Sequence, residues 1–122
     1  MICRKTCGSL RSVGVRFHDH QVLNDISLEI EANAITVLIG RSGSGKTTFL
    51  RILNRLNELF ENCHTAGQII LEIRGRSLDI YDSRIQVELL RRKVGMVFQN
   101  PNLLPLSIYR NIAMPLRIVT GA

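Results

Sequence analysis

Residues 40–47 read Gly-Arg-Ser-Gly-Ser-Gly-Lys-Thr and match the pattern G-x-x-x-x-G-K-[ST] at every fixed position. The apolar run at residues 35–39 predicts a fully buried strand before this loop, and residues 46–60 predict a helix after it. A strand, a glycine-rich loop and a helix in this order form the setting in which such a loop holds phosphate groups. The stretch therefore predicts a site for a nucleoside triphosphate rather than a simple tight turn.

The chemistry of the loop assigns roles to its residues. Glycines let the backbone curl until successive N–H groups point at one set of phosphate oxygens. The Lys46 ammonium is expected to reach the β- and γ-phosphates, and the Thr47 hydroxyl is expected to bind Mg²⁺. The predicted nucleotide-binding residues of this stretch are Gly40, Arg41, Ser42, Gly43, Ser44, Gly45, Lys46, Thr47 and Thr48.

Composition places the chain among ordinary globular proteins. Its 122 residues are enough for one hydrophobic core and short for two domains, with 45% hydrophobic and 21% charged residues. No apolar run approaches the length of a membrane span, and the basic N-terminus lacks the apolar segment of a signal peptide. We therefore expect a cytoplasmic chain with no membrane span of its own.

The net charge of +6 raises the question of a nucleic-acid partner. The basic residues are scattered along the chain without interleaved aromatic residues, so we expect no nucleic-acid interface. The excess of basic residues is then explained by acidic counterparts that lie in another part of the protein.

The cysteines Cys3, Cys7 and Cys63 are too few for a disulfide framework. A metal site could be drawn from Cys3 and Cys7 with His18 or His20, but the spacing matches none of the usual zinc patterns. Reduced thiols are expected.

The remaining pattern alternates between strands and helices. Residues 10–18, 28–30 and 67–73 predict strands, and Ala32-Asn33 predicts a turn. Residues 94–98 predict a short buried strand that leads to Gln99.

Two further helices are expected in the second half of the chain. Residues 83–86 have the form of a capping box, which opens a helix that ends in the cations of residues 91–93. We interpret these cations as favourable charges at the negative end of the helix dipole. Ser107 is a candidate cap for a short helix over residues 108–113, ending before Pro115.

Taken together, these residues resemble the ATP-binding subunits of ABC transporters. Phe17 lies 29 residues before Lys46, where that family places an aromatic residue that stacks on adenine, and Val22 resembles the small apolar residue beside the base. Residues 94–99 resemble the family's Q-loop. The resemblance implies that Gln99 helps Thr47 to bind Mg²⁺ and orients the attacking water. The alternatives are a core role for Phe17 and a strand-end role for Gln99.

The resemblance sharpens in three segments. Residues 53–59, 99–102 and 105–111 look like those of phosphate-importer ATPases. This implies an ATPase component of an import system, with phosphate as cargo by analogy alone. The alternatives are an ABC ATPase for another anion, an ABC ATPase associated with nucleic acid, and a small phosphate-loop kinase or nucleotidase.

The family resemblance also implies a fold class and partners. The expected fold is α/β: an ABC-type P-loop NTPase core with an N-terminal antiparallel β portion. Residues 1–122 are expected to form a single, incomplete domain, because the family's signature sequence, acidic pair and switch histidine do not occur in them. Lys46 and Gln99 then contribute to a catalytic centre that this chain does not complete, so we expect ATP binding without hydrolysis. The implied partners are membrane-spanning permease subunits and a second ATP-binding subunit, at the cytoplasmic face of the membrane.

Overall fold

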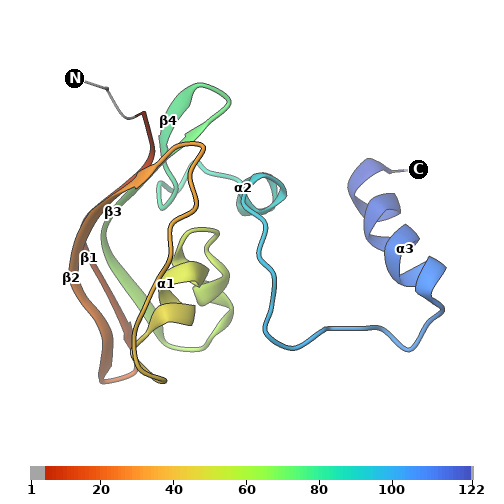
Figure 1. Cartoon of the computed structure of the whole chain (residues 1–122), viewed down its shortest axis with the longest axis horizontal. Helices are drawn as coiled ribbons and strands as arrows, with labels where there is room; N and C mark the ends of the chain where they lie inside the picture. Colours follow the sequence, from red (N-terminus) through yellow and green to blue (C-terminus); the bar gives the residue numbers. More distant parts are fainter. Residues whose placement is uncertain (1–4, 122) are drawn as a thin grey trace.

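The computed structural model describes residues 5–121, and its largest element is a four-stranded antiparallel sheet. The strands run in the order β2-β1-β3-β4, and one face of the sheet packs on helix α1 (Figure 1). The strands are β1 (Thr6–Phe17), β2 (His20–Glu31), β3 (Cys63–Ile73) and β4 (Arg76–Asp79). The helices are α1 (Lys46–Ile52), the 3₁₀ turn η1 (Leu56–Leu59), α2 (Val87–Lys93) and α3 (Ile108–Thr120).

The expected N-terminal antiparallel portion is confirmed, with longer strands than the sequence pattern suggested. The first and third predicted strands correspond to β1 and β3, and the second extends back to His20. The hairpin between β1 and β2 pairs Phe17 with His20. The predicted turn after β2 is also present, and Asn33 adopts a φ of 55° there.

The hydrophobic core lies between the sheet and the inner side of α1. Alternate residues of β1 point to this side, and α1 contributes Phe49 and Ile52 to it. Burial of these side chains fixes α1, and therefore the loop before it, against the sheet. The buried cluster consists of Leu10, Val13, Val15, Leu23, Phe49, Ile52, Ile69, Leu71, Ile80 and Leu90.

The predicted buried strand at residues 35–39 is wrong for this structure. These residues form no strand, and the side chains of Ile35, Val37 and Ile39 are 94%, 71% and 94% exposed. An isolated extended segment needs neighbouring strands to satisfy its backbone N–H and C=O groups. Among residues 5–121, no strand pairs with this segment.

The predicted strand at residues 94–98 is absent for the same reason. This segment has no strand partner within residues 5–121, and the Val97 side chain is 97% exposed. The expected P-loop sheet of the core is therefore not formed by the described residues.

The helix predicted over residues 46–60 ends early, at Ile52. Asn54 turns its side-chain oxygen to the Leu56 N–H (3.3 Å), and Arg55 takes a left-handed φ of 59°. The Arg55 side chain forms an ion pair with Glu58 (2.9 Å), donates to the Ile80 carbonyl (3.2 Å) and lies over the Tyr81 ring (5.3 Å to the centroid). The chain then continues as the η1 turn.

The two later helices also differ from their predicted bounds. The capping box at residues 83–86 is not formed: α2 begins at Val87, and the Arg84 N–H donates to Asp82 instead. The cap at Ser107 is confirmed, because its hydroxyl accepts from the Arg110 N–H (3.2 Å). Helix α3, however, runs past Pro115 to Thr120.

Helix α3 continues past Pro115 to a glycine cap. The Gly121 N–H donates to the Arg117 carbonyl (2.8 Å), and Gly121 closes the helix with a φ of 70°. No side chain of α3 is buried, and the helix lies apart from the sheet (Figure 1). Within the described part of the chain, no helix has both the length and the apolar character that crossing a bilayer requires.

Candidate phosphate-binding site

The loop at residues 40–47 curls because of left-handed backbone conformations that its sequence supplies. Gly43 and Gly45 have φ values of 78° and 91°. Gly45 also lies against β2: a Cβ at this position would meet Leu23 Cδ2 at 3.0 Å and Val22 Cγ1 at 3.2 Å. The glycine therefore lets the loop pass close to the sheet and turn directly into α1.

The Lys46 side chain folds back over the loop. Its ammonium donates to the carbonyls of Gly40 and Arg41, both at 2.7 Å, and lies 3.3 Å from the Ser44 hydroxyl. The Ser44 N–H closes the turn by donating to the Arg41 carbonyl (3.1 Å). The loop thus holds one positive charge against its own carbonyls, in a position open to solvent.

The other predicted residues of the loop surround this charge. Thr47 follows Lys46 at the start of α1 and is exposed, as are Arg41 and Ser42, whereas Thr48 is half-buried. A hydroxyl oxygen is a hard ligand of the kind that Mg²⁺ prefers. A lysine ammonium and a threonine hydroxyl in neighbouring positions therefore fit a magnesium-bound polyphosphate.

Val22 and Phe17 lie on the strands next to the loop. Val22 lies close to the loop at Gly45, and its place beside the adenine base remains a prediction. The half-buried Phe17 ring meets the Phe60 ring edge-on, with centroids 6.0 Å apart and an angle of 88°. Phe17 is thus packed against the protein, and its role in stacking on adenine remains a prediction.

Gln99 is not brought into contact with the loop. Its side chain is exposed, and the structure records no hydrogen bond from it to any described residue. The sequence pattern placed Gln99 at the end of a buried strand, and that strand is not formed. Its role as a second Mg²⁺ ligand beside Thr47 therefore remains a prediction.

A buried polar network behind α1 was missed by sequence reasoning. Asn57 is fully buried; its amide donates to the Thr65 hydroxyl (2.8 Å) and contacts Cys63 Sγ (3.4 Å). The Tyr81 hydroxyl lies 2.9 Å from the Asn57 side-chain oxygen and 3.1 Å from the Ile52 carbonyl. This network joins the end of α1 to β3, because Ile52 is the last residue of the helix. Nothing in the local sequence pattern indicates it, since its members come from α1, η1, β3 and the chain after β4.

Burial of Tyr81 leads to a testable dependence of stability on pH. Burial raises the pKa of Tyr81 to about 12, from an ordinary value of 10.0. The unfolded chain releases the phenolic proton at the lower pKa, so the free energy of unfolding is expected to fall as the pH rises from about 10 to about 12. Urea unfolding of Tyr81→Phe over this range should show a smaller fall than the parent chain.

The exposed Tyr109 provides the control for this experiment, because Tyr109→Phe removes a phenol that is 72% exposed. An equal fall in the free energy of unfolding in the parent chain and in Tyr81→Phe, between about pH 10 and pH 12, would contradict the prediction.

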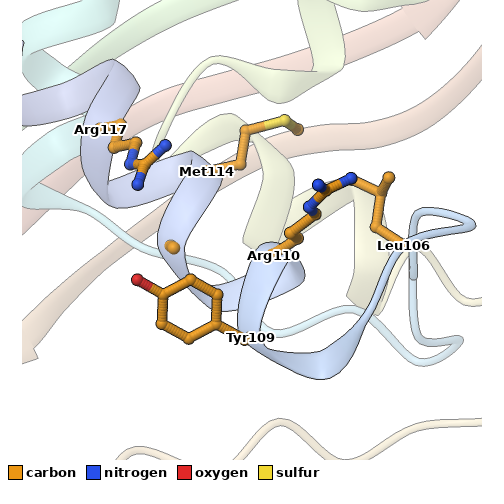
Figure 2. A pocket seen from close by; sticks show the side chains of 6 residues that line it. Leu106, Tyr109, Arg110, Met114 and Arg117 are labelled. Carbon is orange, nitrogen blue, oxygen red and sulfur yellow. The ribbon is translucent and has the colours of Figure 1, made fainter.

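The cysteines and the cavities do not add to the phosphate-binding site. Cys3 lies outside the described residues, and the Cys7 thiol lies 3.5 Å from the Glu31 carbonyl. Residues 5–121 contain no group of three or more His, Cys, Asp or Glu side chains that could hold a metal ion. An open pocket of about 560 Å³ on one face of α3 (Figure 2) is lined by no residue of the loop. Its lining residues are Leu106, Tyr109, Arg110, Ala113, Met114 and Arg117.

Comparison with known proteins shows the family of this chain. The family model of the ABC transporter domain matches residues 23–118. The chain is 46% identical over 105 residues to the phosphate import ATP-binding protein PstB 3 of Streptococcus pneumoniae serotype 4, a match that covers 86% of this chain and 40% of that protein. It is also 46% identical over 108 residues to the phosphate import ATP-binding protein PstB 2 of Bacillus licheniformis, covering 88% and 38%. The chain thus spans about two fifths of the length of these relatives. Because the family model covers most of the chain, the protein belongs to the ABC transporter ATPase family.

Proposed function

We propose that this chain binds Mg-ATP through the loop at residues 40–48 and forms part of the ATP-binding component of an ABC import system. The observation that supports this best is the Lys46 ammonium, which lies against the loop carbonyls of Gly40 and Arg41. On binding ATP, Lys46 exchanges these carbonyls for the more negative phosphate oxygens. Such charge-assisted hydrogen bonds are stronger than those to neutral carbonyls.

Each remaining site residue has a role in this proposal. The Thr47 hydroxyl and the Gln99 amide oxygen hold Mg²⁺, and Phe17 and Val22 contact the adenine base. When bound, Mg²⁺ offsets negative charge on the phosphates. Val22 already borders the loop, whereas Gln99 has to approach it for this role.

We propose phosphate as the transported substrate, because both relatives described above are named as phosphate import proteins. Residues 105–111, at the start of α3, belong to the segment that looks like phosphate-importer ATPases. The proposed partners are membrane-spanning permease subunits and a second ATP-binding subunit, at the cytoplasmic face of the membrane. The exposed apolar side chains of α3, among them Ile108 (83%), Tyr109 (72%) and Ile112 (63%), are available for protein contacts.

The test of nucleotide binding is titration of the 122-residue chain with a fluorescent ATP analogue, with and without Mg²⁺. Unlabelled ATP should displace the analogue, and inorganic phosphate should displace it only weakly, since it lacks the base and two phosphates. Failure of saturating ATP to displace the analogue would contradict the proposed function.

We expect the chain to bind ATP without hydrolysing it. In-line attack on the γ-phosphate needs a group that positions water and a contact that stabilises the transition state. The acidic pair and the signature sequence that supply these in the family do not occur among the 122 residues. A phosphate-release assay should therefore show no turnover above the no-protein blank. Turnover that disappears in Lys46→Ala, in a preparation free of other ATPases, would contradict this expectation.

A further inference from the structure

The end of the phosphate-loop helix is tied to α2 by one arginine. Arg91 on α2 reaches across and donates from Nε to the Asn54 carbonyl (3.2 Å) and from Nη2 to the Arg55 carbonyl (2.8 Å). The two acceptors belong to consecutive residues just after α1, and the Arg55 carbonyl also accepts from the Glu58 N–H (3.3 Å). One guanidinium therefore binds two carbonyls of the chain that leaves the phosphate-loop helix.

Asn54 completes this connection in the opposite direction. Its side chain is only 3% exposed, and its amide donates to the Val94 carbonyl (3.3 Å). Val94 directly follows α2 and is the first residue of the segment leading to Gln99. Asn54 and Arg91 thus link the segment after α1 to α2 and to the residue that directly follows it.

The two neighbours of Arg91 do not share this role. Arg92 and Lys93 are exposed, and within residues 5–121 the structure records no hydrogen bond or ion pair for either side chain. Favourable charge at the end of a helix requires only a cation in the last turn. The contacts of Arg91, by contrast, depend on the planar fork of its guanidinium, because a lysine ammonium is a single point charge. Arg91 therefore does more than complement the helix dipole.

The end of α1 also has contacts that are independent of α2. Arg55 donates to the Ile80 carbonyl, and the Tyr81 hydroxyl lies 3.1 Å from the Ile52 carbonyl. These contacts do not involve α2. Leu90 still anchors α2 in the core, so loss of the contacts of Arg91 and Asn54 should loosen the start of the segment after α2 and leave α1 in place.

We propose that Asn54 and Arg91 are positioning residues that hold Val94, the first residue of the Gln99 segment (residues 94–99), in a fixed relation to the phosphate-loop helix. This inference rests on the proposed function, because Gln99 acts at the Mg²⁺ of the bound nucleotide only in that proposal. A segment held at its first residue explores fewer directions, so Gln99 loses less conformational freedom when it reaches the metal. The two residues therefore strengthen the Mg²⁺-dependent part of ATP binding and leave the Mg²⁺-free part unchanged.

The first arm of the experiment measures the distance between α1 and the Gln99 segment in the absence of nucleotide. Spin labels are placed at Leu50→Cys on α1 and Val97→Cys in the Gln99 segment, both on exposed side chains, after replacement of the native cysteines by serine. Pulsed electron resonance then gives the distribution of distances between them. Arg91→Lys and Asn54→Asp should widen this distribution at least about twofold, and Arg92→Lys, the matched control, should not. A width that is equal in all four chains overturns the inference.

The second arm measures ATP affinity of the same substitutions in the otherwise native chain, with Mg²⁺ and with EDTA. The advantage that Mg²⁺ confers on ATP affinity should fall about fivefold or more in Arg91→Lys and Asn54→Asp, a change typical of coupling between sites. The affinity in EDTA should stay within about twofold of the parent, which loss of folding would not allow. A wider distance distribution with an unchanged Mg²⁺ advantage would show a merely structural role and would overturn the inference.

The two arms separate this inference from the proposed function. If the chain does not bind ATP at all, the proposed function fails, whereas the distance distributions still report whether Arg91 and Asn54 hold the segment. If ATP binding depends on Lys46 but the distance distributions are the same in the parent chain and in the variants, the proposed function stands and the positioning role is refuted.

Discussion

Replacement of Lys46 by alanine is expected to lower the affinity for ATP by about 100-fold or more. The ammonium can donate to oxygens of two phosphates, and hydrogen bonds to charged groups contribute about 1.5–3 kcal/mol each. Because each 1.4 kcal/mol is a tenfold change in the dissociation constant, loss of two such bonds exceeds a hundredfold change. Displacement of a fluorescent ATP analogue, with Mg²⁺ present, measures this effect.

Lys93→Ala is the matched control, because it removes the same charge at the exposed end of α2, away from the loop. Circular dichroism should show unchanged secondary structure in both variants, since the Lys46 side chain bonds only within the exposed loop. Equal affinities in the parent chain and in Lys46→Ala would place the nucleotide elsewhere and would refute the proposed site.

Gly67→Ala is expected to lower the free energy of unfolding by about 3 kcal/mol or more. A left-handed backbone conformation costs about 1–2 kcal/mol for a residue with a Cβ, and Gly67 has a φ of 89°. A Cβ there would also lie 2.4 Å from the Ser12 carbonyl oxygen and 2.7 Å from that of Arg11. Overpacking of this kind adds about 1–3 kcal/mol.

The close approach at Gly67 has a clear origin in the sheet. Arg11 pairs with Gln68 and Gly14 pairs with Ala66, so two residues of β1 lie opposite the single residue Gly67. This is a β-bulge, and it brings the β1 backbone onto β3. Gly67 is therefore required at the junction of the two central strands.

Gly75→Ala provides the comparison for this effect. Gly75 also has a positive φ, 73°, but nothing lies within 4 Å of a Cβ at its position. Gly75→Ala should lower the free energy of unfolding by only about 1–2 kcal/mol, which is the cost of the backbone conformation alone. Thermal unfolding should then show a fall in the melting temperature of roughly 10 °C for Gly67→Ala and clearly less for Gly75→Ala. Equal losses in the two variants would contradict the argument from close packing.

The local parts of the fold were predictable because their causes are local. Alternation of apolar residues predicted β1 and β3, Asn33 predicted a turn, and Ser107 predicted a helix cap. Each of these signals depends on side chains a few residues apart, so it survives in any tertiary context that buries the apolar face.

Predictions that depended on distant partners were wrong or remained open. Residues 35–39 and 94–98 are apolar enough for buried strands, but strand formation needs a neighbour, and the described chain supplies none. The early end of α1 likewise depends on Ile80, which lies 25 residues from Arg55. No local pattern contains that information.

By itself, the sequence predicted the phosphate loop, because residues 40–47 combine glycines, a lysine and a threonine in a spacing typical of phosphate binding. Only the tertiary structure decided which side chains hold this loop in place. Asn57 and Tyr81 meet behind α1, and Arg91 and Asn54 join the ends of α1 and α2 across 37 residues of chain. The physical reason is that a backbone carbonyl accepts a hydrogen bond from whatever donor the fold brings near it, and sequence distance does not enter.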